Sequence, residues 1–299
     1  MSQVGKPLAF IPVLAFMLLG VFWGSNFIYM KLASNLLSTT QIVFFRVLFG
    51  FLPVLIYSWL SGALAWSQLK YIGHFFVMAL IATTFYYYFF VKGTSLLLSG
   101  VAGAISGSIP LFTFILAVIF LKEEKVSAQR VIGVLVGLFG VFLIARPSGQ
   151  ELLSTNLEGL FYIVAGSLSG GASYVYARKY ISPRKILPSA LTTYQLGLAL
   201  LLLSVVTDYN GIGKIWTDTH ASLGLVVGLG LLGTGGAYLI YYYIVDHLGA
   251  VVASSVNYIP PIVALLIGSF IVGEPIEFVD CLATAIIFFG VFLLKRRLS

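Results

Sequence analysis

The sequence predicts an all-α integral membrane protein of ten transmembrane helices, arranged as two inverted five-helix repeats. Three observations predict it: an apolar composition, a series of charge-free windows and a repeat at an offset of 150 residues. The chain has 299 residues, of which 60% are hydrophobic and 9% are charged, and its mean hydropathy is +1.03. Soluble domains carry about 25% charged residues. This chain would leave too much apolar surface in water, so the expected solvent is a lipid bilayer.

Windows long enough for membrane helices follow one another along the chain. A membrane-spanning helix takes about 20 mainly apolar residues, whereas a transmembrane strand shows about ten residues of alternating polarity. The windows here are continuous, which favours helices. They cover residues 7–30, 47–69, 71–91, 93–121, 131–145, 159–177, 186–207, 219–245, 248–273 and 281–294. The first is longer than the apolar core of a signal peptide, and we expect it to be a retained helix.

The net charge of +7 indicates an orientation rather than a nucleic-acid partner. With the N-terminus inside, 12 of the 17 Lys and Arg residues fall in inside segments, four fall in outside loops and Arg46 lies within the second helix. Cytoplasmic segments of membrane proteins are enriched in Lys and Arg. We therefore expect a multi-pass protein, of a bacterial inner membrane, with both termini in the cytoplasm.

An internal repeat relates the two halves of the chain. When residues 99–144 are placed on residues 249–294 without gaps, 11 of 46 positions are identical, including an Ile-Pro pair, a glutamate and the block Phe-Gly-Val-Phe-Leu. Five helices per copy is an odd number, so the second copy enters the membrane from the opposite side. Inverted repeats are typical of secondary transporters, which bind substrate near the midplane. The predicted units are residues 1–147 and 155–299, and the expected mechanism is alternating access.

The segment FWGSNFIYMKLA at residues 22–33 resembles the first helix of EamA-type proteins of the drug/metabolite transporter superfamily. The Pro-then-Glu pattern of the two repeated segments is similar too. The resemblance implies ten helices and the export or exchange of small metabolites. The chain departs from it at residues 167–179, SLSGGASYVYARK, where such proteins often carry a second tryptophan. The shape of the pocket on that side therefore stays open.

Prolines interrupt two predicted helices at equivalent positions. Pro110 and Pro260 lie near the middle of their windows, and Pro261 follows. A proline inside a helix clashes with the carbonyl four residues earlier, and a carbonyl freed in lipid must find a partner or line a watery cavity. We expect the three prolines to act as hinges, with a kink healed by neighbouring helices as the alternative. The small polar residues before them are predicted cavity residues: Ser106, Ser108, Ser254 and Asn257.

Other predicted substrate-binding residues are aromatic or polar side chains at membrane depth. An asparagine is costly in hydrocarbon unless it is paired. Tyrosine combines a flat apolar face with a hydrogen-bonding tip, which suits an aromatic or amphipathic solute. Interfacial anchoring is the alternative for the tyrosines. At most two of the three consecutive tyrosines 86–88 can face a cavity, because neighbours on a helix point in different directions. These candidates are Trp23, Asn26, Tyr29, Tyr87, Tyr174, Tyr238, Tyr242 and Tyr258.

Arg46 is the one cation well inside a predicted span, about one turn from its outer face. We expect its side chain to snorkel outward. The alternative is an inward side chain that holds an anionic group such as a carboxylate. No acidic residue lies at mid-membrane depth, where ion-coupled carriers often place one. The sequence therefore favours uniport, exchange or coupling through the charge of the substrate.

These features predict a transporter rather than an enzyme, with a small molecule and the lipid bilayer as its partners. The leading substrate is an amino acid or a related, aromatic compound. A nucleotide-sugar or phosphate-ester antiporter of the same superfamily is the alternative, and it would need several cations in its cavity. An intramembrane enzyme is the alternative from another class. One cysteine and three histidines without metal spacing predict no metal site, and no cofactor is expected.

A GxxxG face at Gly133 and Gly137 predicts a close helix contact. The same face offers a possible homodimer contact.

Overall fold

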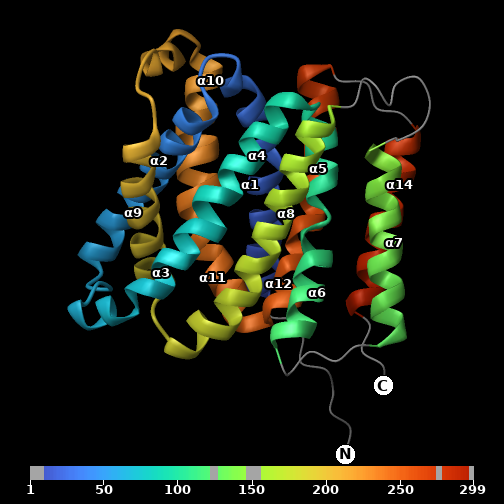
Figure 1. Cartoon of the computed structure of the whole chain (residues 1–299), viewed down its shortest axis with the longest axis horizontal. Coiled ribbons are helices and arrows are strands. Elements are labelled where there is room, and N and C mark those ends of the chain that lie inside the picture. The colour runs from blue at the N-terminus through green and yellow to red at the C-terminus, as the bar shows by residue number, and fades with distance from the viewer. Residues whose placement is uncertain (1–9, 122–126, 146–155, 274–277, 296–299) are drawn as a thin grey trace, which may run out of the picture.

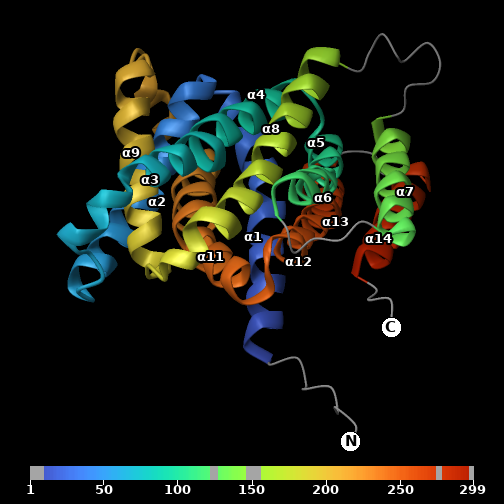
Figure 2. The same ribbon diagram turned by 60° about the horizontal axis from the view of Figure 1, so that its bottom comes forward.

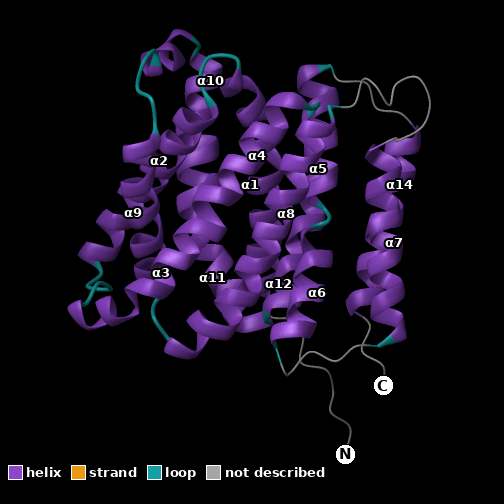
Figure 3. Cartoon of the chain, viewed as in Figure 1, coloured by secondary structure: helices purple, strands orange, loops and turns teal. Residues whose placement is uncertain are grey.

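The computed structural model describes residues 10–121, 127–145, 156–273 and 278–295, and their regular structure is helical throughout (Figures 1 and 3). Six helical segments are long and apolar enough to cross a membrane: Val13–Ser34, Thr39–Leu60, Trp66–Leu96, Ser99–Phe120, Pro188–Val206 and Thr219–Leu248. The predictions of an all-α fold and of a multi-pass membrane protein therefore agree with the structure.

The first half of the chain contains helices α1 to α7 and the shorter elements η1 and η2. η1 is a 3-10 helix and η2 is a π-helix, and together with α3 and α4 they form one long, irregular helix. In order, the elements are α1 (Phe10–Ser34), α2 (Thr39–Leu60), η1 (Trp66–Tyr71), α3 (Ile72–Met78), η2 (Ala79–Thr84), α4 (Phe85–Leu96), α5 (Ser99–Ser106), α6 (Ile109–Phe120) and α7 (Ala128–Ala145).

The second half contains helices α8 to α14, again with π-helical and 3-10 segments between them. The elements are α8 (Leu157–Tyr176), η4 (Ala177–Ile181), η5 (Ser182–Arg184), α9 (Pro188–Val206), η6 (Ile212–Thr217), α10 (Thr219–Leu223), η7 (Gly224–Gly236), α11 (Ala237–Leu248), α12 (Ala250–Ser254), η8 (Ser255–Tyr258), α13 (Ile259–Ile267), η9 (Gly268–Val272) and α14 (Phe278–Lys295).

α1 and α2 begin and end at other residues than the charge-free windows 7–30 and 47–69. α1 continues past Lys31, whose Nζ lies 2.8 Å from the carbonyl oxygen of Leu97, just after the end of α4. A cation at a helix C-terminus satisfies free carbonyls there and complements the helix dipole. α2 begins at Thr39, after the capping residue Ser38, so Arg46 lies two turns inside the helix rather than one.

Each repeated proline lies in the first turn of a helix that follows an irregular stretch. α5 ends at Ser106 and α6 begins at Ile109, which places Pro110 in the first turn of α6. In the same way, Pro260 and Pro261 lie in the first turn of α13. A proline there costs no helical hydrogen bond, because the first-turn N–H groups have no partner within the helix. Each proline therefore follows an irregularity inside a longer helical stretch: a two-residue turn at 107–108 before Pro110, and the 3-10 helix η8 at Ser255–Tyr258 before Pro260. Their role as hinges stays a prediction.

Helices of the two halves pack against each other in a crossed pattern. α1 lies against α13, α8 lies against α6, and α2 lies against η7. Figures 1 and 2 show α7 and α14 as a pair at one side of the molecule. A Cβ atom added at Gly290 of α14 would lie 2.6 Å from the carbonyl oxygen of Gly133 and from the amide nitrogen of Gly137. The structure thus uses the GxxxG face of α7 for a contact within the chain.

Candidate functional site

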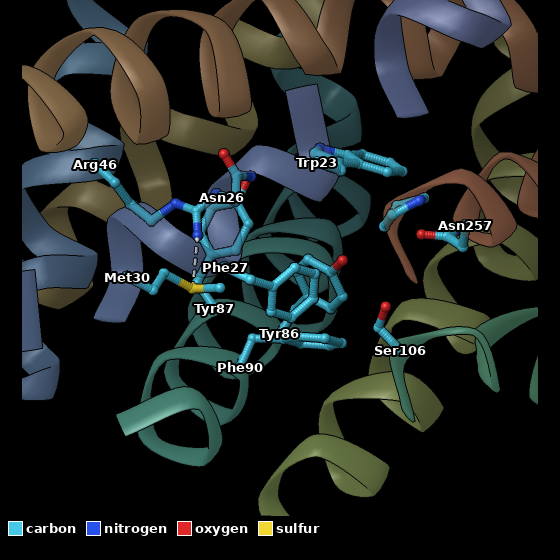
Figure 4. A pocket seen from close by; sticks show the side chains of 11 residues that line it. Trp23, Asn26, Phe27, Met30, Arg46, Tyr86, Tyr87, Phe90, Ser106 and Asn257 are labelled. Atoms are coloured by element: carbon cyan, nitrogen blue, oxygen red, sulfur yellow. Dashed lines mark hydrogen bonds between the residues drawn. The ribbon is translucent and has the colours of Figure 1, made fainter. Parts of the chain in front are cut away.

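A narrow cavity lies where α1, α2, α4 and α5 of the first half meet η8 and α13 of the second. Figure 4 shows Arg46 and Met30 at one end of its wall and Ser106 and Asn257 at the other, with aromatic rings between them. Helices of both halves therefore enclose one site. The lining residues are Trp23, Asn26, Phe27, Met30, Arg46, Tyr86, Tyr87, Phe90, Ser106, Asn257 and Pro260.

A second, smaller cavity shares Trp23 and Tyr86 with the first. The first cavity has a volume of about 20 Å³ and the second a volume of about 10 Å³. Such volumes hold roughly one water molecule. A metabolite enters only when these walls move apart. The smaller cavity is also lined by Ala82, Ile109, Gly170, Ser173, Tyr174, Tyr238 and Tyr241.

The guanidinium group of Arg46 is buried at one end of the larger cavity. The residue is 2% exposed, so its side chain does not snorkel outward as expected from the sequence. Its Nε donates to Thr234 Oγ1 at 3.1 Å, and its Nη2 donates to the carbonyl oxygen of Gly233 at 3.4 Å. Both partners belong to η7 in the other half of the chain. Arg46 therefore ties α2 to η7 and at the same time faces the cavity.

The aromatic ring of Tyr87 and the amide of Asn26 also contact the guanidinium group. The centre of the guanidinium lies 3.5 Å from the centre of the Tyr87 ring, which is close cation–π contact. Asn26 donates to the carbonyl oxygen of Phe22 at 3.0 Å and accepts from Arg46 Nη2 at 3.3 Å, in the amide orientation that satisfies both groups. Among the described residues, Nη1 has only a thioether contact, 3.8 Å to Met30 Sδ. These partners, all of them neutral, fix the position of the cation without neutralising it.

The opposite end of the cavity carries open acceptor atoms. Asn257 uses its Nδ2 for Tyr174 Oη, at 2.9 Å, and for the carbonyl oxygen of Ser254, at 3.0 Å. This leaves Asn257 Oδ1 as the open polar atom of that side chain. The hydroxyl of Ser106 donates to the carbonyl oxygen of Gly103, so its lone pairs remain able to accept.

One buried donor in the wall has no partner among the described residues. Trp23 lines both cavities, is 8% exposed, and its Nε1 makes no hydrogen bond there. A buried donor left unpaired costs about 1–3 kcal/mol. An acceptor on a bound molecule would remove that cost.

The described part of the chain contains no candidate metal site. No group of three or more His, Cys, Asp or Glu residues there is arranged to hold a metal ion.

The sequence matches the EamA-like transporter family twice, over residues 10–146 and over residues 157–296. The chain belongs to the EamA-like transporter family. A relative from Archaeoglobus fulgidus, named an uncharacterized transporter, is 24% identical over 92% of this chain and 95% of its own length. YdfC of Bacillus subtilis, also named an uncharacterized transporter, is 25% identical over 84% of this chain and 80% of its own.

Two further comparisons bear on the membrane and on the fold of this EamA-like transporter. YedA of Escherichia coli, named an uncharacterized inner membrane transporter, is 29% identical over 65% of this chain and 61% of its own. A solved crystal structure aligns with 95% of this chain and 96% of its own at a TM-score of 0.68 and 16% identity, which shows a shared fold.

The structure places the other residues predicted to bind substrate away from the larger cavity. Tyr174 and Tyr238 line the smaller one. Tyr29 packs its ring against Gly224 and Gly228, where an added Cβ atom would lie 2.6 Å and 2.3 Å from it. Four more lie in neither wall: Tyr242 donates to Gln195 Oε1, Ser254 donates to the carbonyl oxygen of Val251, and Ser108 and Tyr258 have buried hydroxyls without a partner among the described residues.

Sequence reasoning missed several wall residues of this EamA-like transporter. Phe27 and Met30 follow Trp23 at the four- and seven-residue spacing of one helix face, which could have identified them. Tyr86 and Phe90 belong to the aromatic run at 85–90, where two of the three consecutive tyrosines do face the cavity. Gln195 lies in neither wall, but it is fully buried inside α9 and donates to Thr83 Oγ1 at 2.7 Å.

Proposed function

We propose that this EamA-like transporter is a secondary transporter that moves a small organic metabolite across the membrane by alternating access, as an exporter or an exchanger. The observation that carries the proposal is the cavity, because helices of both halves enclose it and its wall combines aromatic rings with open polar atoms. Several flat aromatic faces suit an amino acid or a related compound, and an aromatic one most of all.

We propose further that ten helices cross the membrane as two inverted repeats, residues 1–147 and 155–299. If α8 is the counterpart of α1 and α13 that of α6, the repeat maps the α1–α13 contact onto the α8–α6 contact, and both are present. In Figure 1, α7 runs upward and its counterpart α14 runs downward. The separate family matches in the two halves also support this arrangement.

Both termini are proposed to be cytoplasmic, in a bacterial inner membrane. α1 begins and α14 ends at the lower end of the molecule in Figure 1. The segments at that end include η1, η4 and η5, which carry Lys70, Arg178, Lys179 and Arg184. An excess of Lys and Arg is typical of the cytoplasmic side. The name of the Escherichia coli relative YedA, an uncharacterized inner membrane transporter, adds support for the inner membrane.

The alternatives receive less support from the site. A nucleotide-sugar or phosphate-ester antiporter needs several cations around its substrate, and Arg46 is the one Lys or Arg in the two walls. An intramembrane enzyme needs a reactive constellation, and none is evident among the described side chains of these walls. A homodimer stays a prediction.

Counterflow in proteoliposomes tests the proposed function. Purified protein is reconstituted with an unlabelled solute inside, and uptake of the labelled solute is followed without an ion gradient, across a panel of amino acids, aromatic acids, nucleosides and sugar phosphates. We expect transient accumulation of at least one label. Asn26→Ala should reduce it, because Asn26 holds Arg46 at the cavity, whereas Ser204→Ala on the exposed face of α9 should not. Folded protein without counterflow of any solute would contradict the proposal.

A further inference from the structure

The unbalanced charge of the cavity narrows the class of substrate. α1, α2, α4 and η7 surround Arg46, and their sequences contain no Asp or Glu. Charges inside a membrane protein are costly unless they are paired. A bound molecule that brings one negative charge would neutralise this end of the cavity.

The geometry around Arg46 favours a carboxylate as that negative group. Arginine presents five N–H donors in a planar fork that matches the two oxygens of a carboxylate. In the described part of the chain, the Nη1 group makes only the weak contact with Met30 Sδ, at 3.8 Å. A carboxylate oxygen is a much better acceptor than a thioether. It can replace this contact while Thr234 and Tyr87 continue to hold the guanidinium group in place.

The same charge distribution disfavours an α-ammonium group. In an α-amino acid the ammonium is attached to the carbon next to the carboxylate, so it would lie beside the guanidinium of Arg46. Two like charges about 4–5 Å apart repel each other strongly inside a protein. The neutral oxygens of Asn26, Gly233 and Thr234 already accept from Arg46, and no acidic side chain stands on the surrounding helices. A zwitterion would leave one positive charge unpaired.

The far end of the cavity favours an uncharged hydrogen-bond donor. Asn257 Oδ1 and Ser106 Oγ are acceptors there, and α5, η8 and α13 contain no Asp or Glu. A hydroxyl satisfies such acceptors without bringing a charge. Figure 4 shows the rings of Phe27, Tyr86 and Phe90 between the two polar ends. An aromatic ring can lie among them.

We infer that the substrate is an elongated aromatic monoanion, with its carboxylate on Arg46, its ring among the aromatic side chains and a neutral hydroxyl at Ser106 and Asn257. The inference rests on the proposed function and names the class of solute that the same cavity carries. It selects aromatic acids that lack an α-amino group over the amino acids themselves.

Four ligands of nearly equal shape test the inference by their binding to the purified full-length protein. The ligands are para-hydroxyphenylpropionate, phenylpropionate, tyrosine and tyramine, which differ in one hydroxyl, one ammonium or one carboxylate. Binding is read as the rise in thermal unfolding temperature with ligand concentration, because a ligand of the folded state stabilises it. We expect para-hydroxyphenylpropionate to bind at least about tenfold more tightly than tyrosine, and tyramine not to bind.

Asn257→Ala tests the far end separately. In the native protein, para-hydroxyphenylpropionate should bind about threefold to tenfold more tightly than phenylpropionate, as one hydrogen bond implies. In the variant this preference should fall, because Ser106 Oγ is then the remaining acceptor at that end. An unchanged preference contradicts the assigned direction of the ligand.

The remaining outcomes separate the inference from the proposed function. Tyrosine or tyramine binding as tightly as para-hydroxyphenylpropionate overturns the inference. If none of the four ligands stabilises the protein while counterflow finds another solute, the inference is wrong and the transporter stands. If no ligand binds and no solute exchanges, both fall.

Discussion

Arg46→Gln is expected to abolish exchange of the carboxylate substrate while leaving the protein folded. Removing one partner of a buried, hydrogen-bonded charge pair costs about 2–5 kcal/mol of binding, which corresponds to a loss of affinity of roughly 30-fold or more. The free protein should lose little stability, because the buried guanidinium has only neutral partners and an unpaired buried charge is itself destabilising. The measurements are counterflow rate and thermal unfolding temperature.

Two further variants sharpen this prediction. Arg46→Lys keeps the charge but loses the planar fork and the stacking on Tyr87, so we expect intermediate exchange. Lys92→Gln removes a cation of α4 that lies outside the cavity wall, and exchange should be unchanged. Full activity in Arg46→Gln would show that the cation is structural.

Gly24→Ala is expected to destabilise the contact between the two halves. Its Cβ atom would lie 2.4 Å from Val263 Cβ and 3.1 Å from Pro260 Cα, distances that force α1 and α13 apart. Overpacking of this kind costs about 1–3 kcal/mol. The free energy of unfolding in a detergent titration should fall by that amount. Exchange should fall as well, since Pro260 is part of the cavity wall.

Gly73→Ala is the matched control for this substitution. Gly73 lies in α3 with nothing within 4 Å of its added Cβ atom, so stability should be unchanged or slightly higher. Val263→Gly removes the atom that Gly24→Ala meets, and combining the two should restore part of the lost stability. Equal stabilities of the Gly24→Ala and Gly73→Ala variants would contradict close packing of α1 on α13.

The composition and the charge-free windows predict the fold class, because lipid as a solvent leaves few alternatives to the helix. The helix breaks were also predictable, since proline at residues 110 and 260 has a strong local effect. The exact form of the irregularity could not be predicted, because a proline can kink a helix or lie in its first turn. A turn precedes Pro110, whereas the 3-10 helix η8 precedes Pro260.

Side-chain directions could not be read from the sequence. Arg46 points inward because Thr234 and Gly233, nearly 190 positions away, lie beside it. The sequence contained both partners but not their pairing. The same holds for Tyr29, whose ring lies on the glycine face at Gly224 and Gly228 instead of in the cavity. The direction of such a side chain depends on which helices pack next to it in the fold.

The central claim is that one cavity opens to the two faces of the membrane in turn, and thiol labelling tests it most directly. Cys281 is exposed and is the single cysteine, so Cys281→Ser provides a background without thiols. Ser106→Cys then places one thiol in the cavity wall. Ser61→Cys after α2 and Thr217→Cys in η6 are exposed one-sided controls at opposite ends of the molecule.

A membrane-impermeant thiol reagent is applied to right-side-out and to inverted vesicles. We predict that Ser106→Cys reacts from both faces and that the transported solute slows both reactions, whereas each control reacts from one face. Reaction of Ser106→Cys from one face alone would contradict alternating access at this cavity.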